Sequence, residues 1–127
     1  MNLVLDSGGL SALARQRARL QELLRRGLWP AQVPSVVLAE ALTGDHRRDF
    51  LTNRLLRTCQ VRDVDEVLSR EAARLRTATG RAGTVSAVDA VVAALAGEHG
   101  GVVLTTDPQD LRALVDGAAS PVSVVRV

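Results

Sequence analysis

Short apolar runs rich in valine and leucine alternate along this chain with longer stretches whose apolar residues have a helical spacing. We expect strands at residues 3–5, 31–33, 60–62, 102–105 and 122–127. We expect helices at residues 10–24, 34–42, 47–57, 65–79, 86–99 and just after Pro108. Parallel strands need a long crossover connection, and a helix between consecutive strands supplies one. The alternation therefore predicts an α/β fold with three layers, α/β/α, around a central parallel sheet of four to five strands.

The composition indicates how the interior of such a fold would be built. Apolar residues make up 46% of the 127 residues, but only Trp29 and Phe50 are aromatic, so valine, leucine and alanine must fill the core. This favours helices packed on a buried sheet over an aromatic-rich all-β design. The length suits a single domain over residues 1–127, with no room for a second core.

All 16 basic residues are arginine, and the absence of lysine excludes several chemistries. A P-loop kinase needs a phosphate-binding lysine, a Schiff-base enzyme needs an amine, and a phosphorelay receiver also needs a lysine. A haloacid dehalogenase-like phosphatase needs a second aspartate two residues after the first, and Gly8 occupies that position after Asp6. The formal net charge of +2 permits a nucleic-acid partner without establishing one.

The sequence also predicts where the protein acts. Cys59 is the only cysteine, so an intramolecular disulfide is impossible and we expect a reducing compartment. A signal peptide would need a charged start and an apolar run of about 7–15 residues, which the sequence does not open with. Nor does any stretch approach the roughly 20 apolar residues of a membrane span. We therefore expect a cytoplasmic protein.

Four acidic residues are candidates for chemistry, although each also has a structural explanation. Asp6 follows the first apolar run and would suit the cap of the next helix, and the same holds for Asp107 before the last helix. Ser86 and Asp89 have the spacing of a capping box, although glutamate or glutamine is the usual last residue. Glu40 interrupts an apolar helix, and its structural alternative is a solvated position at the helix edge.

The four acids indicate more as a set than singly. Asp6 and Asp107 each follow a predicted strand, and functional sites of parallel sheets lie beyond the carboxyl ends of the strands. If the helices that contain Glu40 and Asp89 lean over the same edge, carboxylates about 4 Å apart would repel by ~4 kcal/mol per pair. Protons or a cation must relieve such repulsion. Oxygen ligands suit Mg²⁺ or Mn²⁺, which can activate water for phosphodiester hydrolysis.

These motifs match those of a known family. The chain resembles the PIN-domain ribonucleases, and specifically the VapC-type toxins of bacterial toxin–antitoxin pairs. Val4-Leu5-Asp6-Ser7 is similar to the family's opening strand, and Val36-Val37-Leu38-Ala39-Glu40 to the segment with its glutamate. Ser86-Ala87-Val88-Asp89-Ala90 resembles the third acidic motif, and Leu104-Thr105-Thr106-Asp107-Pro108 the fourth. The resemblance covers essentially the whole chain, with the four motifs in order.

The resemblance implies more than the residues alone. It implies a PIN fold, with Asp6, Glu40, Asp89 and Asp107 as catalytic and metal-binding residues. It implies dependence on Mg²⁺ or Mn²⁺ and endonucleolytic cleavage of RNA. It further implies a homodimer, inhibited by a cognate antitoxin protein whose tail occupies the site. The alternative is a non-catalytic PIN-like module that acts through a protein partner.

Two features depart from the family pattern or extend it. Gly8-Gly9 stands where family members often have a polar or small residue before an apolar one, so we expect a looser first turn. Asp110 offers a second acid near Asp107 and leaves the fourth ligand open between the two. The hydroxyl of Thr105 or Thr106 is placed to hydrogen-bond a metal ligand or water, although threonine at a strand end is usually structural.

Five arginines are candidates for RNA phosphate contacts. They are Arg47, Arg48, Arg54 and Arg57, clustered in one predicted helix, and Arg81 in the flexible glycine-containing segment before Asp89. Solvated surface positions are the alternative for each. With two aromatic residues in the chain, base stacking cannot be the main mode of recognition.

Overall fold

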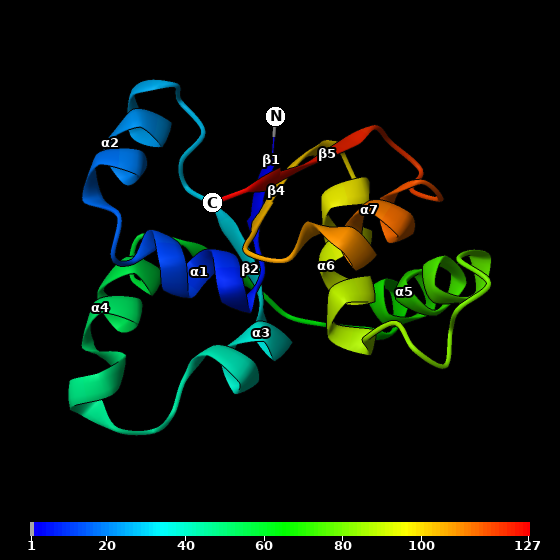
Figure 1. The fold of residues 1–127 in the computed structure, drawn as a ribbon, viewed down its shortest axis with the longest axis horizontal. Coiled ribbons are helices and arrows are strands. Elements are labelled where there is room, and N and C mark those ends of the chain that lie inside the picture. The colour runs from blue at the N-terminus through cyan, green and yellow to red at the C-terminus, as the bar shows by residue number, and fades with distance from the viewer. Residues whose placement is uncertain (1) are drawn as a thin grey trace.

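The computed structural model describes residues 2–127, which form five strands and seven helices (Figure 1). The strands are β1 (Asn2–Leu5), β2 (Gln32–Pro34), β3 (Gln60–Arg62), β4 (Gly101–Thr105) and β5 (Val122–Arg126). The helices are α1 (Ser7–Leu13), α2 (Arg17–Arg25), α3 (Ser35–Ala41), α4 (His46–Leu56), α5 (Glu66–Ala78), α6 (Ala87–Gly97) and α7 (Pro108–Val115). With one exception, each element lies within a few residues of its predicted position.

The five strands form one parallel sheet in the order β3-β2-β1-β4-β5, which confirms the predicted α/β/α architecture. Helices α1, α2 and α4 lie on one side of the sheet, and α5, α6 and α7 lie on the other (Figure 1). The chain leaves β1 toward one edge of the sheet and leaves β4 toward the other, so these two neighbours form the topological switch point. Leu5 pairs with Leu104, so Asp6, the first residue after β1, lies level with Thr105, the last residue of β4.

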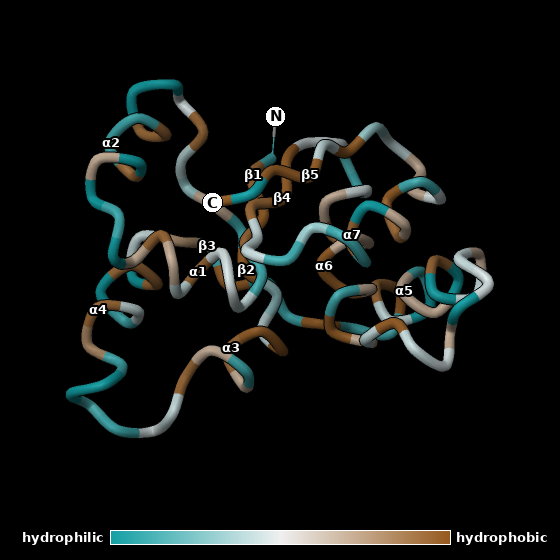
Figure 2. The backbone as a smooth tube through the Cα atoms, viewed as in Figure 1, coloured by the Kyte–Doolittle hydropathy of each residue, from teal (hydrophilic) through white to brown (hydrophobic). Residues whose placement is uncertain are grey.

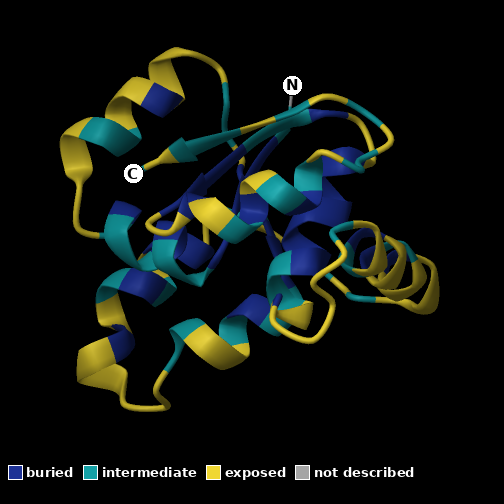
Figure 3. Ribbon diagram, turned by 45° about the vertical axis from the view of Figure 1, so that its right-hand side comes forward, coloured by how far each residue is buried: buried dark blue, intermediate teal, exposed yellow. Residues whose placement is uncertain are grey.

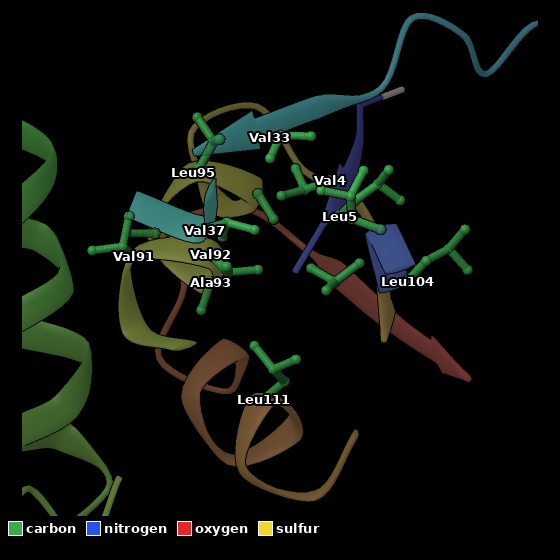
Figure 4. Close-up of a cluster of buried hydrophobic side chains, with 14 of the residues drawn as sticks. Val4, Leu5, Val33, Val37, Val91, Val92, Ala93, Leu95, Leu104 and Leu111 are labelled. Carbon is green, nitrogen blue, oxygen red and sulfur yellow. The ribbon is translucent and has the colours of Figure 1, made fainter. Parts of the chain in front are cut away.

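The core is built from valine, leucine and alanine, as predicted (Figure 4). The hydrophobic segments of the chain include the central strands and α6 (Figure 2). Val4 and Leu5 of β1 pack between the helix layers, with Leu104 beside them and Val92 of α6 across the sheet (Figure 4). Every residue of α6 from Ala90 to Gly97 is buried, because the sheet, α5 and α7 surround this helix (Figure 3). Even α6 has only 11 residues, and no helix within residues 2–127 is long and apolar enough to cross a membrane.

The exception is the helix expected at residues 10–24, which is two helices, α1 and α2. The single-helix prediction was wrong because the apolar spacing stops after Leu13. The positions one turn further on are Gln16 and Arg17, so no continuous apolar stripe holds a longer helix against the sheet. The backbone N–H groups of Arg15 and Gln16 instead bond carbonyl groups three residues back, which tightens the last turn of α1 and ends it.

The glycine pair at the start of α1 makes the first turn tighter than expected, and the prediction of a looser turn was wrong. A Cβ atom on Gly9 would lie 2.1 Å from the carbonyl oxygen of Leu104, and one on Gly8 would lie 2.3 Å from Oγ1 of Thr106. Any side chain at Gly9 would thus collide with the backbone of β4. The pair is what allows α1 to start directly against the end of the neighbouring strand.

We expect Gly9→Ala to lower the free energy of unfolding by about 1–3 kcal/mol or more, because the new methyl group collides with backbone atoms. Alanine otherwise stabilises a helix relative to glycine, so the sign of the change is diagnostic. Urea denaturation measures it. Gly83→Ala is the matched control, since nothing lies within 4 Å of a Cβ atom at that position. Equal stability of Gly9→Ala and wild type would contradict the close packing.

Candidate functional site

Asp6 is the first residue after β1. Its side chain caps α1 and also accepts a hydrogen bond from the end of the neighbouring strand β4. Its Oδ1 accepts a hydrogen bond of 2.7 Å from the backbone N–H of Gly9. Its Oδ2 accepts a bond of 2.5 Å from the hydroxyl of Thr105, the last residue of β4. Both side chains are buried, Asp6 with 8% of its surface exposed and Thr105 with none. The capping explanation for Asp6 therefore holds, but it accounts for only one of the two oxygens.

The Thr105 hydroxyl also fixes the start of the loop that contains Asp107. It accepts a hydrogen bond of 3.0 Å from the backbone N–H of Asp107 while it donates to Asp6. Asp107 occupies the N-cap position of α7, yet its carboxylate makes no capping hydrogen bond. The residue is exposed. Capping therefore does not explain the Asp107 carboxylate, which is free to face solvent or a ligand.

Asp89 lies in the first turn of α6, where Ser86 provides the cap. The Ser86 hydroxyl oxygen accepts hydrogen bonds from the backbone N–H groups of Val88 and Asp89, at 3.1 and 3.3 Å. The reciprocal bond of a capping box is not made, because the Asp89 carboxylate accepts no hydrogen bond from any residue within 2–127. Asp89 is half-buried. Its carboxylate is therefore partly removed from water and has no hydrogen-bond partner within the described residues.

Glu40 lies in the last turn of α3, in an exposed position. This matches the solvated edge that was the structural alternative for this residue. Its charge nevertheless acts on the other acids, because it contributes to raising the pKa of Asp6 and of Asp89. Helix α3 packs against α1, which brings the end of α3 to the side of the sheet edge where Asp6 lies.

The acids influence one another most clearly at Asp89. The pKa of Asp89 is raised to about 6, most of all by burial and further by the negative charges of Asp6, Glu40, Asp110 and Asp107. These five carboxylates, which we call the acidic edge, therefore share one electrostatic neighbourhood although they come from five separate elements or loops. Such mutual repulsion is a cost to the fold that a bound cation would remove.

Asp6 shows the same pattern with opposing contributions. Burial raises its pKa, the hydrogen bonds from Thr105 and Gly9 oppose that rise, and the charges of Glu40 and Asp107 add to it. Asp49 provides a contrast within the same chain. It is also buried, but hydrogen bonds from Thr43 and Gly44 lower its pKa, so its charge is satisfied structurally.

The donor set of the acidic edge fits a hard divalent cation in type and in charge, since it consists of carboxylate oxygens with hydroxyl support. The side chains are not gathered into a ready coordination shell. Within residues 2–127, no three His, Cys, Asp or Glu side chains lie close enough together to hold a metal ion as they stand. The acids are thus near enough for their charges to interact, but no three of these side chains are close enough together to coordinate one metal ion.

Asp110 differs from the other acids of the acidic edge because it has a basic partner. Nη2 of Arg81 lies 3.3 Å from Oδ1 of Asp110. The carboxylate of Asp107 has no such partner among the described residues, which favours Asp107 over Asp110 as the fourth candidate ligand. The ion pair was not evident from the sequence, because Arg81 and Asp110 are 29 residues apart.

One hollow of the surface lies apart from the acidic edge. A groove of about 510 Å³ lies between α5 and α6, lined among others by Val67, Arg74, Ala94 and Glu98. None of the five acids lines it. The open acidic edge suits a long ligand that lies across the surface, whereas an enclosed pocket suits a small molecule.

These observations define a class of protein: an α/β domain with a wholly parallel sheet and a group of carboxylates at the switch point between β1 and β4. The family model described as PIN domain matches residues 3–115. The chain therefore belongs to the PIN-domain family. Among curated proteins, none matches this sequence.

Several solved structures share the fold across nearly the whole chain. DNA-bound VapBC from Salmonella typhimurium matches with a TM-score of 0.74 and 17% identity, over 99% of this chain and 98% of that chain. VapBC2 from Rickettsia felis, bound to a DNA fragment from its promoter, matches with a TM-score of 0.72 and 15% identity, over 98% and 99%. FitAcB from Neisseria gonorrhoeae matches with a TM-score of 0.67 and 21% identity, over 95% and 96%. At these identities the likeness establishes the fold.

The raised pKa of Asp89 predicts how stability depends on pH in EDTA. The pKa in the folded state, about 6, lies above the ordinary 3.8, so folding favours the protonated form. The resulting stability is fully present below pH 3.8 and is lost as the pH rises through 6. We therefore expect the free energy of unfolding of Asp89→Asn to be higher than that of wild type by about 1–2 kcal/mol at pH 7.5, after allowance for solvent screening.

That difference should shrink as the pH falls and should nearly vanish at about pH 3, because Asp89 is then largely protonated in the unfolded state as well as in the folded state. Urea denaturation of both proteins across this range measures it. A difference that stays constant with pH would show that the substitution acts through packing and that charge at Asp89 does not oppose folding.

Proposed function

We propose that this PIN-domain protein is a metal-dependent endoribonuclease of the VapC type, the toxin component of a toxin–antitoxin pair, acting in the cytoplasm. The observation that carries the proposal is the mutual charge repulsion of the acidic edge at the switch point of the sheet. Asp107 and Asp89 have carboxylates that no capping role explains. A fold tolerates such a group where a ligand requires it.

Asp6, Glu40, Asp89 and Asp107 would hold Mg²⁺ or Mn²⁺. The bound ion would supply an activated water and would neutralise charge on a phosphodiester. The chain's own contribution is orientation. Thr105 holds one oxygen of Asp6 and the backbone of Asp107 at the same time, so two strands present their acids in a fixed relation.

RNA fits the acidic edge better than a small phosphate ester does. Glu40 and Asp107 are exposed and the edge lies open, which suits a polymer that passes across it. The two aromatic residues of the chain are too few for base stacking, so contacts to the backbone phosphates must dominate. The arginines of α4, Arg47, Arg48, Arg54 and Arg57, are candidates for the more distant phosphates.

The partners follow from the same proposal. VapBC and FitAcB structures share this fold, and we propose a cognate antitoxin protein as the inhibitor of this chain and a homodimer as its assembly. One observation favours a second candidate, a non-catalytic PIN-like module that acts through its partner. This is the lack of a ready metal shell among residues 2–127. Metal binding and cleavage separate the two candidates.

Metal binding can be tested without any cleavage. We expect Mn²⁺ at about 100 times its dissociation constant to raise the free energy of unfolding by ~2.7 kcal/mol. Thermal unfolding with and without Mn²⁺ measures this. Asp6→Asn and Asp89→Asn should lose most of the stabilisation. Asp116→Asn, at the exposed C-cap of α7, should retain it. A protein indifferent to Mn²⁺ would favour the non-catalytic candidate.

Cleavage is tested on total RNA with Mg²⁺ or Mn²⁺ present. We expect Asp6→Asn and Asp89→Asn each to lower the rate by at least roughly 100-fold, because each removes a charge that holds the metal. EDTA should abolish cleavage by wild type, and Asp116→Asn should cleave normally. Equal cleavage by all four proteins would reject the assignment and would indicate a contaminating nuclease.

A further inference from the structure

Arg81 is the one arginine that pairs with a member of the acidic edge among the four ion pairs within residues 2–127. Its guanidinium lies 3.3 Å from Asp110, and the two side chains are 45% and 40% exposed. The charge of Asp110 in turn raises the pKa of Asp89. A fixed positive charge therefore stands at the border of a group of negative ones.

The loop beneath Arg81 is held in place by a neighbouring arginine. Arg76, in the last turn of α5, donates from Nε to the carbonyl oxygen of Val85 at 2.9 Å and from Nη2 to that of Ala82 at 2.6 Å. These bonds fasten the loop between α5 and α6 to the end of α5. The segment expected to be flexible is thus braced at two points.

The backbone of Arg81 is held from within the same loop. Its N–H donates to Oγ1 of Thr79 at 3.0 Å, and its carbonyl oxygen accepts from the backbone and the hydroxyl of Thr84, at 2.9 and 3.1 Å. The side chain, by contrast, makes one hydrogen bond within residues 2–127, to Asp110. The backbone of Arg81 is thus fixed, while its guanidinium has one exposed partner. Such a guanidinium can exchange one anionic partner for another.

We propose that Arg81 binds a backbone phosphate of the RNA beside the acidic edge and leaves Asp110 when the RNA binds. This inference rests on the proposed function and names the residue that positions its substrate. Five carboxylates repel a polyanion, and a divalent ion offsets only part of that charge. An exposed ion pair is weak, whereas a guanidinium and a phosphate form two parallel hydrogen bonds. The exchange is therefore favourable.

The structure separates Arg81 from the arginines that the sequence had grouped with it. Arg47, Arg48, Arg54 and Arg57 lie on or beside α4, on the side of the sheet that α1 covers (Figure 1). None of them pairs with an acid of the acidic edge within the described chain. Arg81 contacts α7 and precedes α6, so it borders the two elements that present Asp107 and Asp89.

The test measures binding of a single-stranded RNA oligonucleotide by fluorescence anisotropy, with Ca²⁺ in place of Mg²⁺ and a gel to verify that the RNA stays intact. We expect Arg81→Ala to weaken binding about tenfold and to reduce the salt dependence of log Kd by about 0.7, the loss of one phosphate contact. Arg81→Lys should recover the salt dependence. In cleavage assays, Arg81→Ala should raise KM and leave kcat nearly unchanged.

Two variants distinguish phosphate binding from a structural role. Asp110→Asn frees Arg81 and should bind RNA at least as tightly as wild type; if the ion pair is merely structural, it will bind as weakly as Arg81→Ala. Arg70→Ala is the matched control, because it breaks an exposed ion pair with Glu66, within α5 and not with an acid of the acidic edge. Unchanged binding and salt dependence in Arg81→Ala, with normal cleavage by wild type, would overturn this inference alone. Wild-type protein that neither binds nor cleaves RNA would overturn the proposed function as well.

Discussion

The hydrogen bond between the Thr105 hydroxyl and Asp6 joins the ends of the two central strands, and the arrangement of the site depends on it. Strands β1 and β4 are neighbours in register, so Asp6 lies beside Thr105 at the end of β4. The close approach of Gly9 to Leu104 brings the start of α1 against the same strand end. Because the contact is buried, water does not compete with it. The first acid of the site is thus oriented by the fold itself.

Much of the fold could be predicted from the sequence, because strands and helices leave different periodicities. The short apolar runs that end at Asp6 and Thr105 marked the central strands correctly, and their alternation with helices implied the parallel sheet. The break between α1 and α2 was missed because leucines on both sides of Gln16 imitate one stripe. The tight turn at Gly9 was missed because a glycine has no pattern of its own, and only the position of Leu104 shows why it is required.

The position of the acids at one edge of the sheet was predictable, but their geometry was not, and their role as metal ligands stays a prediction. Their order and their strand ends pointed to one sheet edge, and their charges do act on one another there. The sequence could not show that Asp107 leaves its cap unused or that Asp110 is paired with Arg81. Both facts depend on side-chain directions set by distant parts of the chain. The spacing of residues along the sequence does not predict such side-chain directions.

Helix α6 links the interior to the acidic edge mechanically. Ala90, Ala93 and Ala96 have no exposed surface, so an added methylene at these positions has no free space to enter. A helix resists bending, so a larger side chain at these positions would shift α6 as a rigid body. Asp89 lies in the first turn of α6 and would move with it. Small side chains deep in the protein are therefore a condition for the position of Asp89 at the acidic edge, which couples the packing of the core to the proposed metal site.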